Sequence, residues 1–181
     1  MKIFFEKRLS AWLDRFVIWN EKGEVIFQVK GVMAMAQKFM LLDAEGNEIG
    51  MVKETMNIGT QFNLIHNNEK IGTVKKKGLF GSQFVTDYKD WTVEGDIVPW
   101  SYRIQSADGQ PAAVLGKDLV PGRNAFGVEI TNPEDLIPVI MVILAVDSER
   151  CTSGRRDVRK EIKKDLEKDK AESKAKKRGK K

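Results

Sequence analysis

Residues 132–147 read Asn-Pro-Glu-Asp-Leu-Ile-Pro-Val-Ile-Met-Val-Ile-Leu-Ala-Val-Asp, and this stretch decides the fold. Its first four residues provide an N-cap, a proline suited to the first helical position and two acidic side chains for the first turn. The next eleven residues have no polar stripe, and a helix that is apolar all round must be buried all round. Their β-branched members would also suit a buried strand, but Pro138 and the capping pattern favour a helix, which we predict over residues 133–148.

The length of this helix limits what can surround it. The eleven apolar residues, at about 1.5 Å each, extend about 16 Å, which matches the depth of a small β-barrel. A helix that spans a bilayer needs about 20 apolar residues. We therefore predict that the run fills the interior of a domain and does not cross a membrane.

The sequence before the helix reads as short β segments separated by turn residues, with no helical period between them. Turn sequences begin at Asn20, Asp43 and His66, in steps of 23 residues, and Asp108-Gly109 supplies a later turn of the same kind. The flanking segments echo one another as the hairpins of a meander would, although chance similarity among hairpins gives the same pattern. The predicted strands are 3–8, 15–19, 25–31, 37–42, 48–54, 60–65, 69–76, 81–87, 90–95, 100–106, 110–117 and 125–130.

Two of the echoing segments break the alternation of apolar residues. Ile49 and Val52 are three residues apart, as are Ile71 and Val74, whereas a regular strand needs two or four. A glycine lies between the members of each pair, where a β-bulge would absorb the extra residue and let the sheet coil and close. We therefore predict a mainly β fold, a twelve-stranded antiparallel closed β-barrel around the central hydrophobic C-terminal α-helix.

Four segments also carry a resemblance to a known family. They are Val25-Ile-Phe-Gln-Val-Lys-Gly31, Leu41-Leu-Asp-Ala-Glu-Gly-Asn-Glu-Ile-Gly50, Trp91-Thr-Val-Glu-Gly-Asp96 and Ile143-Leu-Ala-Val-Asp147. In this order, with the apolar helix last, they resemble the LURP-one-related family, which is grouped with the tubby C-terminal domain and the phospholipid scramblases. The resemblance covers about residues 3–150. It implies a tubby-like barrel around a central helix and, in some relatives, phosphoinositide or membrane association.

The chain also departs from the pattern of these relatives. Scramblases are described with a calcium-binding acidic segment beside the helix and a cluster of lipidated cysteines. Here Asp147 and Glu149 are followed by basic residues, and Cys151 is the single cysteine. Scramblase activity is therefore not implied, and no residue is carried over from the basic pocket of the tubby domains.

Charge divides the chain into a body and a tail. Residues 1–154 carry 17 Lys/Arg and 20 Asp/Glu, whereas residues 155–181 carry 14 Lys/Arg and 6 Asp/Glu. The basic character of the protein therefore belongs to its C-terminal part. We predict a barrel domain over residues 1–150 and a basic, partly helical or disordered tail over residues 151–181.

Two basic features are the candidate binding sites. Lys75, Lys76 and Lys77 close a strand, where such charges usually solvate an edge; as a binding site they would contact an anionic headgroup. The tail can keep the protein soluble, attract an anionic membrane surface, or bind nucleic acid or an acidic protein. The predicted binding residues of the tail are Arg155, Arg156, Arg159, Lys160, Lys163 and Lys164.

No catalytic constellation stands out in the sequence. There is one histidine, His66, and one cysteine, so a Cys–His pair or a serine triad would depend on a residue that reads as part of a turn. Structural zinc needs four Cys/His ligands, and two exist. We therefore expect no enzymatic activity, no cofactor and no metal, with a hydrolase that uses His66 as the competing class.

The cellular setting follows from what the sequence lacks. One cysteine allows no intramolecular disulfide, which fits a reducing compartment. The apolar stretch at the N-terminus is too short for a secretory signal. We expect a cytoplasmic protein, with peripheral membrane association as the alternative. Its barrel would bind phospholipid headgroups, or its tail would bind nucleic acid or an acidic protein.

Overall fold

The computed structural model describes residues 1–7, 14–32, 34, 36–55, 60–77, 83–96, 100–117 and 125–148. The chain separates into two compact units, Met1–Asp147 and Ser148–Lys181. Within the second unit, only Ser148 belongs to the described residues. The predicted basic tail therefore lies outside the described part of the chain, and its conformation stays a prediction.

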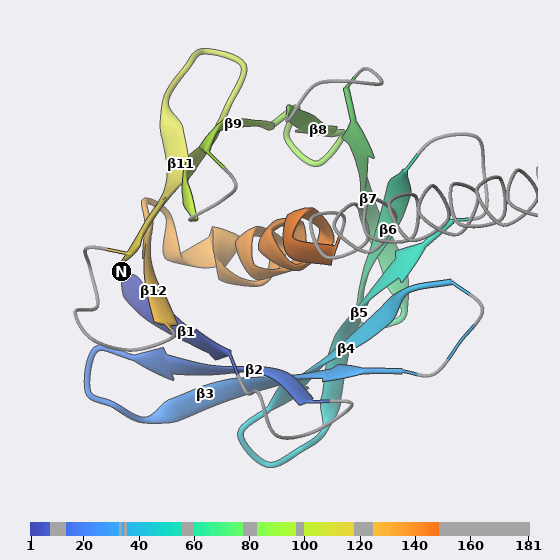
Figure 1. The fold of residues 1–181 in the computed structure, drawn as a ribbon, viewed down its shortest axis with the longest axis vertical. Helices are drawn as coiled ribbons and strands as arrows, with labels where there is room; N and C mark the ends of the chain where they lie inside the picture. The colour runs from blue at the N-terminus through green and yellow to red at the C-terminus, as the bar shows by residue number, and fades with distance from the viewer. Residues whose placement is uncertain are drawn as a thin grey trace, which may run out of the picture. The chain divides into compact units, whose positions relative to one another are not determined.

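The described strands form one closed antiparallel barrel, which confirms the predicted fold class (Figure 1). Each strand pairs with its neighbours in sequence, and β12 pairs with β1 to close the ring. The strands are β1 (Lys2–Lys7), β2 (Asp14–Asn20), β3 (Val25–Gly31), β4 (Lys38–Asp43), β5 (Glu48–Glu54), β6 (Gln61–His66), β7 (Glu69–Lys76), β8 (Phe84–Thr86), β9 (Thr92–Asp96), β10 (Ser101–Gln105), β11 (Pro111–Gly116) and β12 (Ala125–Ile130).

The observed strand boundaries differ most from the predicted ones at β8 and β9. Of the described residues in the strand predicted over 81–87, those in a strand are Phe84–Thr86, and the next strand begins at Thr92 instead of 90. Between them the chain turns sharply, because Lys89 and Asp90 both adopt a positive φ of 50°. Apolar side chains near this turn gave a strand-like pattern although the backbone is not extended there.

The predicted β-bulges are present. In the pairing of β4 with β5, Leu41 faces Gly50 while Leu42 faces Glu48, so Ile49 is the extra residue. The pairing of β6 with β7 skips Ile71 in the same way. The corresponding residues of the β2–β3 and β10–β11 hairpins are also skipped. Four hairpins of the barrel therefore carry a bulge near the start of their returning strand, which increases local coiling of the sheet.

The C-terminal helix fills the barrel. A short 3₁₀ turn, η2 (Pro133–Asp135), leads into an α-helix over residues 136–148. Every side chain from Val139 to Val146 is at most 2% exposed, so the helix contacts its surroundings on all sides. Figure 1 shows it running through the ring of strands, in orange. The prediction of a central, fully buried helix is confirmed.

One close contact fixes how the helix lies against the sheet. A Cβ atom added at Gly50 of β5 would overlap the Cε atom of Met141 and would lie 2.9 Å from the carbonyl oxygen of Ile65. The helix side chain therefore occupies the space that any larger residue at position 50 would need. This glycine serves a close approach, as well as the bulge beside it.

Candidate functional site

The alternating direction of the strands gives the barrel two different ends. The turn end contains the turns that follow β2, β4, β6, β8 and β10, together with the start of the helix after β12. At the opposite end, called here the lysine end, β1, β3, β5, β7, β9 and β11 finish. The candidate binding surface lies on the outside of the barrel near the lysine end.

Four lysines near this end point outward because of the side-chain alternation of their strands. Each is next in sequence to a core residue that is at most 4% exposed, and neighbouring side chains of a strand point to opposite faces. Three of the four are exposed and one is half-buried. We call this set the lysine row: Lys30 on β3, Lys38 on β4, Lys53 on β5 and Lys75 on β7.

The strand register places these lysines close together. Lys38 and Lys53 are direct partners across the β4–β5 pair. Lys30 faces Met40, two residues from Lys38 and on the same face. On β6, which separates Lys53 from Lys75, the facing residues are the polar Asn63 and Gln61. With strands spaced about 4.8 Å apart, the row extends about 19 Å along the sheet.

The facing pair Lys38–Lys53 has no counter-charge among the described side chains, whereas Lys30, at one end of the lysine row, faces Asp14 of β2 in the strand register. Among the described residues, the four side chains of the row make no ion pair and no hydrogen bond, and the ion pairs of Lys2 and Lys89 lie at the turn end. The closest carboxylate in sequence, Glu54, accepts a hydrogen bond from the Gln37 N–H at 3.0 Å. Like charges placed directly opposite in a sheet destabilise it by up to about 1 kcal/mol. The repulsion between the facing Lys38 and Lys53 therefore lowers the stability of the sheet at this point.

The three lysines singled out from the sequence do not form a single patch. Lys75 belongs to the row, whereas Lys76 is half-buried, faces Phe84 and has interactions of its own. Lys77 follows the strand, is exposed, and donates its backbone N–H to the Gln83 carbonyl at 2.8 Å. Consecutive strand residues point to opposite faces, so a run of three lysines cannot share one. The tail residues predicted to bind lie outside the described residues.

Three members of the row were missed because they are far apart in the sequence. Their signal was nevertheless present in the 22–23-residue repeat, since Val29-Lys30, Val52-Lys53 and Val74-Lys75 occupy equivalent places in it. In successive hairpins, a lysine that follows the equivalent core valine lies at the same height along the barrel axis. Only the register shows that Lys38, on the intervening strand, joins them at this level.

The comparisons with known proteins agree with the fold just described. The family model described as LURP-one-related matches residues 1–147. The chain belongs to the LURP-one-related family. A crystal structure of an Arabidopsis thaliana protein matches with a TM-score of 0.59 and 18% sequence identity, over 82% of this chain and 91% of the Arabidopsis chain. At this identity the likeness supports the fold alone. No curated protein matches the chain.

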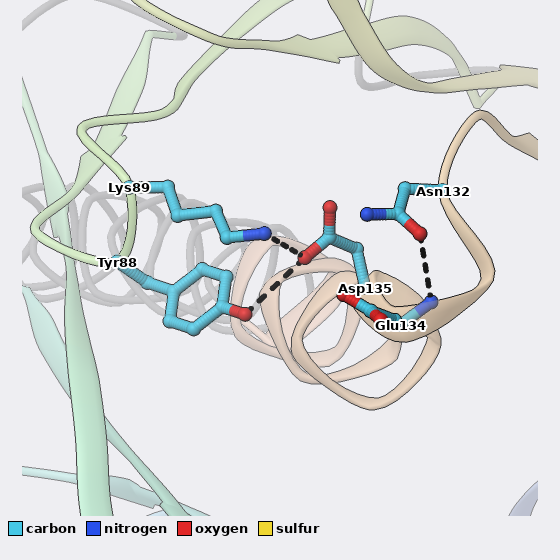
Figure 2. Close-up of polar contacts among 5 residues, drawn as sticks. All are labelled: Tyr88, Lys89, Asn132, Glu134 and Asp135. Carbon is cyan, nitrogen blue, oxygen red and sulfur yellow. Dashed lines mark hydrogen bonds and ion pairs between the residues drawn. The ribbon is translucent and has the colours of Figure 1, made fainter.

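At the turn end, this LURP-one-related barrel holds a buried carboxylate (Figure 2). Asp135, only 5% exposed, accepts a hydrogen bond from the Tyr88 hydroxyl at 3.2 Å and one from the Lys89 Nζ at 2.6 Å. Asn132 caps the start of the helix, since its side-chain oxygen accepts the Glu134 N–H at 3.1 Å. These contacts tie the helix start to the turn between β8 and β9.

The charged and polar groups of Lys89, Tyr88 and Asp135 interact with one another. The hydrogen bond to Asp135 raises the pKa of Lys89, and burial, followed by the charge of Asp135, raises the pKa of Tyr88. The Lys89 Nζ also lies over the rings of Tyr88 and Trp91, 5.5 and 6.0 Å from their centroids. This lysine is therefore engaged in holding the helix, in contrast to the lysine row.

The single histidine of the LURP-one-related domain is also engaged in local contacts. His66 ends β6, and its Nδ1 lies 2.8 Å from the Ile49 carbonyl oxygen. That nitrogen must carry the proton and donate, so Nε2 accepts from the Asn67 side chain at 3.3 Å. Among the described residues, no group of three or more His, Cys, Asp or Glu side chains could hold a metal. Nor is any helix in the described ranges long and apolar enough to span a bilayer.

Proposed function

We propose that this barrel is a non-catalytic module that binds the anionic headgroups of phospholipids through the lysine row. Membership of the LURP-one-related family and the barrel fold support a non-enzymatic binding domain. The observation that carries the proposal is the pair Lys38–Lys53, two like charges held face to face without a counter-ion in the described structure. An arrangement that costs stability and attracts anions is expected where an anion is bound.

The chemistry of the row suits phosphate groups spread over a surface. Lysine ammonium groups are point charges on flexible side chains, so they can contact phosphates at variable positions more readily than the planar guanidinium group of arginine can. Each lysine near an anionic membrane surface contributes about 1 kcal/mol. Four lysines would then supply about 4 kcal/mol, enough for reversible binding that weakens with salt.

The test is sedimentation of the full chain with vesicles of neutral lipid, and with vesicles that contain anionic lipid, at low salt. The variant is Lys38→Gln with Lys53→Gln. The matched control is Lys22→Gln with Lys70→Gln, which removes the same charge from two exposed lysines at the turn end. The first double variant should bind anionic vesicles about 30-fold more weakly, from about 2 kcal/mol. The control should bind like the original chain.

Stability gives a second readout for the same variants. Removing the facing lysines should leave the free energy of unfolding unchanged or raise it by up to about 1 kcal/mol, because a like-charge pair is relieved. Weaker binding with equal or greater stability separates a binding role from a structural one. Equal binding by the Lys38/Lys53 variant and the control would rule out the row as the binding site.

The competing function, nucleic-acid or acidic-protein binding by the basic tail, is tested on the same samples. A labelled DNA duplex shifted equally by the original chain and the Lys38/Lys53 variant would assign anion binding to another part of the protein. Such binding should fall steeply with salt, because phosphate contacts release counterions.

A further inference from the structure

The charges of the whole barrel are separated along its axis. Among residues with described side chains, the turn end holds twelve carboxylates and four lysines, a net charge of −8. They lie in the segments 1–2, 20–25, 43–48, 66–70, 87–91, 105–111 and 129–135. At the other end, the strand ends and the last turn of the helix hold eight lysines and four carboxylates, a net charge of +4.

The lysine end extends beyond the lysine row. Its other lysines are Lys7, Lys76, Lys77 and Lys117, and its four carboxylates are Glu6, Glu54, Asp96 and the buried Asp147. Lys7 and Lys117 stand over buried aromatic rings, 5.9 Å from the centroid of Phe16 and 5.2 Å from that of Trp100. Positive charge therefore surrounds the rim of this end as well as the outer face of β3 to β7.

From this separation, and resting on the headgroup binding proposed above, we infer that the barrel binds an anionic bilayer surface end-on. The lysine end faces the lipid, the β3–β7 side is tilted toward it, and the turn end points away. The partner is thus a membrane surface and not a single soluble phosphate compound. A small soluble ligand bound at the lysine row would lie too far from the turn end for the charges there to affect its affinity.

The distances decide between end-on and side-on binding. Strands of six or seven residues, at about 3.3 Å each and tilted by about 40°, separate the two ends by about 15 Å along the axis. At physiological salt the surface potential decays over about 8 Å, so its value at the turn end has fallen about sevenfold. End-on binding therefore keeps the carboxylates outside the strong part of the field.

Side-on binding would expose those carboxylates to the lipid. Lying on the β3–β7 face would bring the turns at 20–25, 43–48 and 66–70 against the bilayer together with the lysine row. These turns carry six carboxylates and two lysines. Each charge near the surface changes the affinity about fivefold. The repulsion from these turns would cancel the attraction of the four lysines.

Charge substitution at the turn end is the first test. Glu21, Glu45 and Glu69 are exposed, one in each of these three turns, and each is replaced by glutamine in the full chain. End-on binding predicts less than a threefold change in affinity for anionic vesicles. Side-on binding predicts an increase of about 100-fold, from three charges at about fivefold each. An increase of more than 20-fold overturns the inferred orientation.

Energy transfer to the bilayer is the second test. Full chains carrying Cys151→Ser receive a single cysteine by Gln83→Cys at the lysine end or by Glu45→Cys at the turn end; both positions are exposed. Each is labelled with a donor dye and bound to anionic vesicles that contain an acceptor lipid. We expect clearly stronger transfer from position 83. Equal transfer from both, or stronger transfer from 45, overturns the orientation while headgroup binding stands.

Binding of a soluble phosphate compound in place of a membrane is tested in the same vesicle assay. Inorganic phosphate and a soluble inositol phosphate are added at increasing concentration to chain bound on vesicles. Release that needs no more than micromolar inositol phosphate would show a soluble ligand and overturn the membrane partner. Failure of the original chain to bind anionic vesicles at all would overturn the proposed function itself, and this orientation with it.

Discussion

Replacing Gly50 by alanine should destabilise the barrel through its contact with the central helix. The added methyl group would overlap the Met141 Cε and approach the Ile65 carbonyl oxygen to 2.9 Å. Overpacking of this kind costs about 1–3 kcal/mol. Met141→Ala alone should cost about 2–5 kcal/mol, because it leaves a cavity in the core. In the double variant the new methyl group enters the space that Met141 vacates, so the two costs should not add.

The measurement is urea unfolding of the full chain, followed by tryptophan fluorescence. We expect a favourable coupling energy of about 1–2 kcal/mol between the two substitutions. Part of the Gly50→Ala cost should persist, since the Ile65 carbonyl does not move away. The matched control is Gly72→Ala, whose Cβ would lie 3.0 Å from Asp87 Oδ1 and Tyr88 Cβ. Additive costs for Gly50→Ala and Met141→Ala, or equal coupling for Gly72→Ala, would contradict the packing described.

Three further predictions follow from the helix and the turns. Ile143→Asp places a charge in the barrel interior and should abolish cooperative thermal unfolding, whereas Ile143→Val should cost only about 1 kcal/mol; a folded aspartate variant would contradict the central position of the helix. Lys89 and Tyr88 have folded-state pKa values raised above their usual 10.5 and 10.0. Their contribution to stability is therefore present below pH 10 and lost as the pH rises through the raised values. Asp135→Asn should flatten this alkaline loss by less than about 1 kcal/mol, because the lysine is half-exposed, and an unchanged pH profile would argue against the contact. Hydrogen bonds from Asn47 lower the pKa of Asp43 below 3.8. Asn47→Ala should move that pKa back toward 3.8 in an NMR titration, and an unmoved value would show that Asn47 is not the cause.

Sequence reasoning succeeded where a local pattern determines the structure. The apolar run after Asn132 needs an enclosure on all sides, and the spacing of Ile49 and Val52 requires a bulge whatever the neighbouring strand is. Both are properties of one segment, so the sequence alone contains them. The same holds for the β3, β5, β7 and β12 boundaries, which were predicted to the residue.

Sequence reasoning was limited where the arrangement of side chains depends on pairing between strands, and the binding role of the predicted lysines stays a prediction. The candidate site was placed on the consecutive Lys75, Lys76 and Lys77, although alternation directs Lys76 to the face opposite the row and Lys77 lies beyond the end of β7. Lys38 and Lys53 come together because of the β4–β5 register, which a single sequence does not specify beyond its hairpin. The ion pair of Lys89 with Asp135, 46 residues apart, was likewise beyond any local signal.

The position of the filling helix at the end of the domain has a consequence for biosynthesis. β1 is made first, but its second neighbour, β12, and the helix that supports all twelve strands are made about 120 residues later. At roughly 5–20 residues per second, the early hairpins wait about 6–25 seconds on the ribosome before the ring can close. During this interval their inward faces have no helix to cover them, and both edges of the growing sheet are open. Nascent chains of this domain should therefore depend on chaperones that shield exposed β edges, and slowing translation late in the message should lower the yield of folded protein.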